Sequence, residues 1–119
     1  MILPIKILSV LVALEFFYIL YLETFATTSD TTARVFGMDK AELARPSVQT
    51  LFKNQGIYNG LIGVLVLLAA LVFASKIAVM LLMGTIVLVA LYGSLTSSPS
   101  ILFKQGGLAI ITLILCVIF

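Results

Sequence analysis

Four long apolar stretches take up most of this sequence, at residues 2–25, 54–75, 77–96 and 100–119. A helix of roughly 20 residues is about 30 Å long, which matches the hydrocarbon core of a bilayer. In lipid the backbone polar groups must bond inside each segment, so helices are the expected form. Of the 119 residues, 62% are hydrophobic and only 10% are charged. A folded chain of this composition does not have enough polar residues to cover its surface in water. We therefore predict an all-α integral membrane bundle of four transmembrane helices, forming a single membrane domain over residues 1–119.

The connections between these stretches differ greatly in length, and the long one covers residues 27–52. Within it, "DKAELA" is typical of a short helix, with Asp39 as N-cap and Glu42 completing a capping-box-like pair, stopped before Pro46. We expect the segment to be an interfacial loop on the membrane face, either a tether or a gate. It has apolar side chains for that contact: Val35, Phe36, Met38 and Leu43. The final turn offers Ser98 as N-cap and Pro99 as first helical residue.

Lysine and arginine are distributed unequally between the two ends of the predicted helices. Residues of this kind near helix ends favour the cytoplasmic side. The distribution predicts that the loop 27–52 is cytoplasmic and that the N- and C-termini lie outside. The cytoplasmic set is Arg34, Lys40, Arg45, Lys53 and Lys104, and the opposite set is Lys6 and Lys76.

Polar side chains gather in the half of the bilayer next to the long loop. The motif "KNQGIYNG" at residues 53–60 opens an otherwise apolar stretch, and the polar residues of the other helices fall at a similar depth. Unpaired amides are costly in hydrocarbon, so we expect these groups to meet inside the bundle and line a pocket open to the loop side. The predicted ligand-binding residues are Glu15, Tyr18, Glu23, Asn54, Gln55, Tyr58, Asn59, Tyr92 and Gln105.

Three glycines of the second stretch occupy the face that these polar residues leave. At ~100° per residue, Gly56, Gly60 and Gly63 fall within about 60° of one another. Glycines spaced four apart allow two helices to approach closely. We predict that this face packs helices together, within the chain or in a homo-oligomer.

Glu15 is the strongest functional candidate because it lies near mid-membrane. An acidic residue there costs ~2.5–3.5 kcal/mol even on an insertion scale, and such residues usually mark functional sites. Its expected partners are Asn59, Tyr58 and Tyr92, and it is predicted to take up and release a proton. Glu23 lies nearer the interface, where pairing with Lys53 or Lys104 is the simpler interpretation.

Several chemistries are excluded by composition. The chain has no His, and Cys116 is its only Cys, which excludes the usual zinc, haem and Cys/His catalytic sites and any intrachain disulfide. A net charge of +2 without a basic cluster gives no reason to expect a nucleic-acid partner. We predict no metal site and no cofactor.

Four segments resemble a known family: "YLETFAT", "KNQGIYNGL", "ALYGSLTS" and "KQGGLAI" occur in the order found in domain of unknown function family 1304. The resemblance extends over essentially the whole chain. It implies a four-helix protein of the bacterial cytoplasmic membrane, with no known activity, substrate or cofactor. A His often follows the glutamate of the first helix in this family, but here that position is Phe16. Glu15 and Glu23 are then the acid/base candidates within the helices.

Three functions fit these residues, and the sequence favours the first. A protein that binds or transports a small molecule would use Glu15 as the proton-exchanging group, and tyrosines around a carboxylate suit an organic cation. An intramembrane enzyme acting on a lipid-like substrate would use Glu15 or Glu23 as acid/base. No nucleophile motif accompanies them, so no catalytic residue is assigned. A non-catalytic membrane partner subunit would need the polar cluster only to fix helix register.

Overall fold

A computed structural model describes residues 1–97 and 101–119, and its regular structure there is entirely helical. The predicted cap at Ser98 and Pro99 lies outside the described residues. Two of the helices end in a wider π-helical turn, η1 and η2. In chain order the elements are α1 (Leu3–Leu20), η1 (Tyr21–Phe25), α2 (Asp30–Phe36), α3 (Lys40–Leu43), α4 (Pro46–Leu67), η2 (Leu68–Val72), α5 (Lys76–Thr96) and α6 (Ile101–Ile118).

Three helices of the described residues are long and apolar enough to cross a membrane. They cover Leu3–Phe25, Pro46–Val72 and Lys76–Thr96. The apolar helix Leu102–Ile118 is shorter and would be about 26 Å long. The all-α class and the presence of membrane-length helices are thus confirmed, whereas a fourth span stays a prediction.

The segment between the first two long helices is more helical than expected. Besides the predicted short helix α3, it contains α2, which starts after its N-cap Ser29 and ends before its C-cap Gly37. The Ser29 hydroxyl accepts from the Thr32 N–H at 3.2 Å, and Gly37 has a left-handed φ of 64°. Both are ordinary helix-end signals. The expected loop 27–52 is therefore largely two short helices and the start of α4.

Two local predictions around Pro46 need correction. The second long helix begins at Pro46 rather than at Asn54, because proline is well suited to a first helical position. The predicted capping pair does not form, since Asp39 makes no side-chain capping bond. Glu42 instead accepts from Arg45 at 3.2 Å.

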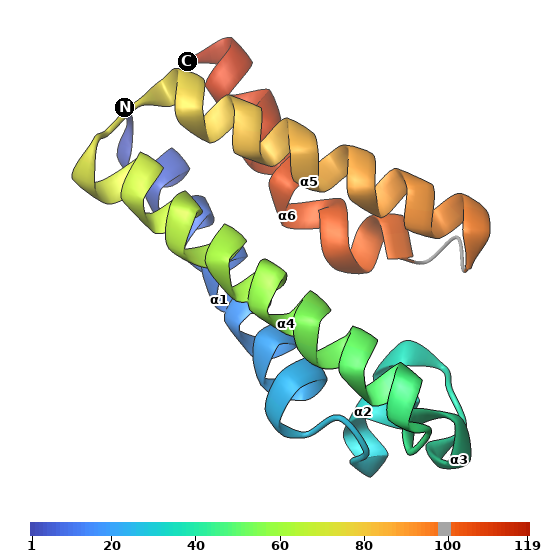
Figure 1. Cartoon of the computed structure of the whole chain (residues 1–119). Coiled ribbons are helices and arrows are strands. Elements are labelled where there is room, and N and C mark those ends of the chain that lie inside the picture. Colours follow the sequence, from blue (N-terminus) through green and yellow to red (C-terminus); the bar gives the residue numbers. More distant parts are fainter. Residues whose placement is uncertain (98–100) are drawn as a thin grey trace. The chain divides into compact units, whose positions relative to one another are not determined.

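The chain divides into two compact units, and each is described by itself. The first unit, residues 1–15 and 64–119, contains the start of α1, the end of α4 with η2, and the antiparallel pair α5 and α6 (Figure 1). Its buried residues recur every three or four positions along each helix, as expected for helix packing. They include Val79, Met83, Ile86 and Ala90 of α5, and Ala109, Thr112 and Cys116 of α6.

The second unit comprises residues 16–63. In it, the end of α1 with η1 runs antiparallel to α4, and α2 and α3 lie at the end where α4 begins (Figure 1). This unit contains the polar motif that opens the second apolar stretch.

Candidate functional site

Glu23 is held in the π-helical turn η1 at the end of the first long helix. The Ala26 N–H donates to the Tyr21 carbonyl at 2.9 Å, across the five-residue separation of a π-turn. Such turns occur frequently at functional sites, because they change the direction in which a side chain points. The Glu23 side chain is fully buried, with 0% of its surface exposed. The turn thus places a carboxyl group inside the packed helix pair.

Two amides of α4 hold the Glu23 carboxylate. Gln55 Nε2 donates to Oε2 at 2.6 Å, and Asn59 Nδ2 donates to Oε1 at 2.6 Å. The two amides are four residues apart, so one face of α4 presents both. We call these three residues, Glu23, Gln55 and Asn59, the Glu23 cluster.

Close approach of the two helices makes these short bonds possible. A Cβ added at Gly56 would collide with Thr24 Oγ1 and would lie 3.1 Å from the Thr24 backbone nitrogen. A Cβ at Gly60 would lie 2.7 Å from Leu20 Cδ2. Gly63 is buried as well. The predicted glycine face therefore contacts the first helix at Gly56 and Gly60.

Threonine hydroxyls fix the backbone around the cluster. Thr27 donates to the Glu23 carbonyl at 2.7 Å, and Thr32 donates to the Ala26 carbonyl at 2.7 Å. Across the helix pair, Thr24 donates to the Lys53 carbonyl at 3.0 Å. Carbonyls at a helix end lack intrahelical partners, and Thr27 and Thr32 supply them at the end of η1. The sequence analysis missed this role, although "ETFATTSDTT" at residues 23–32 is visibly rich in threonine.

The Glu23 cluster contains no basic residue. The ion pairs of the described residues are Lys40–Asp30 at 2.9 Å and Arg45–Glu42 at 3.2 Å, both between exposed side chains. The simpler interpretation of the sequence was an ion pair between Glu23 and Lys53. The structure does not contain this pair among the described residues. Throughout residues 1–97 and 101–119, no three His, Cys, Asp or Glu side chains are grouped to hold a metal ion.

The cluster can accommodate a carboxylate or a carboxylic acid. With the carboxylate, both amides donate, as described above. Side-chain amides carry an oxygen acceptor beside the nitrogen donor, and rotation of either amide would let it accept from a protonated Glu23. The arrangement can therefore hold Glu23 in either protonation state without rebuilding the helices.

Within residues 16–63, the other predicted site residues do not bond to this carboxylate. In the same unit, Asn54 is exposed, and Tyr18 and Tyr58 have 51% and 71% of their surface exposed. In the other unit Tyr92 is 65% exposed. Glu15 and Gln105 are half-buried, and no side-chain hydrogen bond of Glu15 is found within the described residues. Of the nine predicted ligand-binding residues, the structure brings together Glu23, Gln55 and Asn59.

These features define a small helical chain with membrane-length apolar helices and one buried, amide-bonded carboxyl group. The chain belongs to the family described as "Protein of unknown function (DUF1304)", whose model matches residues 10–117. The resemblance predicted from the four segments is thereby confirmed.

Comparison with curated proteins gives a close relative of similar length. The chain is 64% identical over 109 residues to "Uncharacterized protein YpaA" of Lactococcus lactis subsp. lactis (strain IL1403). The aligned region covers 91% of this chain and 92% of that protein. No solved structure matches the chain.

Proposed function

We propose that this chain is a multi-pass integral membrane protein of four spans that binds a small organic cation at the Glu23 cluster, in exchange for a proton. The observation that carries the proposal is a fully buried Glu23 whose two side-chain partners are neutral amides. A carboxyl group of this kind within an apolar helix is expensive and usually functional. Its negative charge is not neutralised in the cluster, so a cation or a proton is the natural ligand.

A purely structural role would not require the acid. Glutamine at position 23 could bond to the same two amides, because amide groups both donate and accept. A neutral residue there would avoid the cost of a buried charge. The acidic group is therefore best explained by a change of protonation or by binding of a positive ligand.

This proposal moves the proton-exchanging role from Glu15 to Glu23. The amide of Asn59, expected near Glu15, donates to Glu23. The exposed rings of Tyr18 and Tyr58 would then face lipid or a neighbouring subunit. With the loop 27–52 in the cytoplasm, the cluster would lie in the cytoplasmic half of the membrane, at the end of the first span.

The test compares Glu23→Gln with Glu15→Gln in purified, detergent-solubilised protein. The probe is tetraphenylphosphonium, with binding followed by calorimetry and proton release by a pH indicator in weak buffer. We expect Glu23→Gln to bind at least about tenfold more weakly, a loss of about 1.4 kcal/mol, and to release no proton. Glu15→Gln, the same change in the same helix, should behave as wild type.

Two outcomes would overturn the proposal. One is equal binding by wild type and Glu23→Gln, when circular dichroism shows that both are folded. The cluster would then only hold the two helices together. Loss of binding and proton release in Glu15→Gln alone would return the role to the mid-membrane glutamate.

A further inference from the structure

The other unit has a sharp corner between η2 and α5. Phe73 and Ser75 close the end of the π-turn, their N–H groups donating to the carbonyls of Leu68 and Ala69 at 2.9 Å each. Between them Ala74 has a left-handed φ of 46°, a conformation uncommon outside glycine. This sharp reversal sends α5 back along η2 with a gap between the two.

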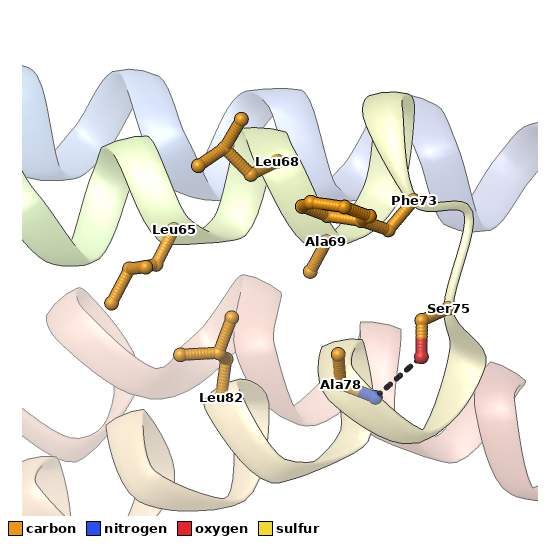
Figure 2. Close-up of a pocket in the computed structure, with 7 residues that line it drawn as sticks. All are labelled: Leu65, Leu68, Ala69, Phe73, Ser75, Ala78 and Leu82. Carbon is orange, nitrogen blue, oxygen red and sulfur yellow. Dashed lines mark hydrogen bonds between the residues drawn. The ribbon is translucent and has the colours of Figure 1, made fainter.

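This gap, called the groove below, is a cavity of about 470 Å³. Its volume is within the size range of small-molecule sites. Figure 2 shows leucine side chains from both helices at the cavity and the Phe73 ring over Ala69, near the corner. Two alanines, Ala69 and Ala78, stand where larger side chains would fill the space. The complete lining is Leu65, Leu68, Ala69, Phe73, Ser75, Ala78 and Leu82.

The lining suits a hydrocarbon chain and has almost no hydrogen-bonding groups for a polar ligand. Apart from Ser75, every lining side chain is apolar. The Ser75 oxygen already accepts from the Ala78 N–H at 3.2 Å, as drawn in Figure 2. A ligand therefore has to bring an apolar body that fills the groove and place its polar part beyond the corner.

Positive charge is found at the corner itself. Lys76 follows Ser75 directly, and residues 64–119 contain no Asp or Glu. No side-chain carboxylate of that stretch can therefore pair with this lysine. A lipid phosphate would provide a partner, through a charge-assisted hydrogen bond from the ammonium group.

From the groove and the charge we propose that this corner binds an anionic phospholipid, with one acyl chain in the groove and the phosphate at Lys76. This site is separate from the Glu23 cluster. Binding here needs neither a change at Glu23 nor transport of a ligand.

The experiment is native mass spectrometry of the detergent-purified chain, titrated with phosphatidylglycerol or with phosphatidylcholine of the same acyl chains. We expect about a fivefold preference for phosphatidylglycerol, the effect of one lysine at an anionic surface. Lys76→Gln should abolish this preference, and its matched control Lys104→Gln, an exposed lysine at the start of α6, should keep it.

A second pair of variants tests the groove. Ala78→Phe fills the cavity and should reduce retention of both lipids severalfold, whereas Leu88→Phe, at a position of α5 that is 67% exposed, should not. Equal retention of the two lipids by wild type, or equal behaviour of Lys76→Gln and Lys104→Gln, would overturn the headgroup assignment. Unchanged retention by folded Ala78→Phe would overturn the groove. Lys76→Gln leaves the packing intact, so its test stands even if Ala78→Phe unfolds.

Discussion

The two units of the chain hold their helices together by different means. In residues 16–63, two glycines bring the helices close and two amides bond to a buried carboxyl group. In the unit built from residues 1–15 and 64–119, α5 and α6 meet through small and apolar side chains such as Ala90 opposite Gly106. In lipid there is no hydrophobic driving force that favours contact of an apolar side chain with another helix over contact with an acyl chain. Directional polar bonds therefore specify one register in the first case, and shape complementarity does so in the second.

The largest expected effect is on the free energy of unfolding, when a glycine of each unit is replaced by alanine. Gly56→Ala places a Cβ against Thr24, including its backbone nitrogen at 3.1 Å, and overpacking of this kind costs about 1–3 kcal/mol. Gly84→Ala in α5 meets nothing within 4 Å and should stabilise the helix by up to about 1 kcal/mol. Unfolding in a series of detergent mixtures would measure both. Equal stability of the two variants would show that α1 and α4 are not closely packed.

The next effect concerns the Glu23 cluster. Asn59→Ala removes one of two donors to a buried carboxyl group and should lower the free energy of unfolding by about 1–3 kcal/mol. In the Glu23→Gln background the same change should cost less, because a neutral side chain loses less without its partner. A double-mutant cycle measures this coupling, expected at about 0.5–3 kcal/mol. Additive effects would contradict the direct bond. Met83→Leu, in the buried face of α5, is the apolar counterpart and should cost less than about 1.5 kcal/mol.

The smallest effect belongs to the exposed charges outside the spans. A hydrogen bond from Lys40 and its positive charge hold the pKa of Asp30 below its usual range. The folded-state pKa is thus lower than the unfolded one, so the stabilisation is present above about pH 4 and is lost as the pH falls below it. Hydrogen exchange in α2 and α3 should show a slight loss of protection on acidification in wild type. Asp30→Asn should show none of that pH dependence, and an identical response of both proteins would contradict the assignment.

Sequence reasoning predicted the long helices well, because composition and length decide them. It placed the glycine face of α4 toward another helix, and Gly56 and Gly60 do contact the first helix. It missed α2, although Ser29 and Gly37 are standard helix-end residues, because short helices carry little hydrophobic periodicity. It placed the start of α4 too late, because apolarity rather than helical propensity was used to find it.

The site was only partly predictable for a geometric reason. Depth along a helix can be estimated from residue number, and that estimate favoured Glu15. Direction around the helix depends on regular turns of 3.6 residues, and the π-turn η1 departs from them at Glu23. No pattern in "YLETF" indicates this wider turn, so Glu23 was one candidate of several and could not be singled out from the sequence as the carboxyl group that the amides of α4 hold.

The reversal at Ala74 has a consequence for how the protein is made. Residues 73–75 can extend at most about 11 Å, so the turn hardly reaches beyond the headgroup region on its side of the bilayer. In a membrane-spanning arrangement, insertion of α4 alone would leave the apolar helix α5 in water on the far side, which is costly in free energy. Entry of the two helices together as a hairpin during synthesis, with this corner as the leading end, would avoid that cost.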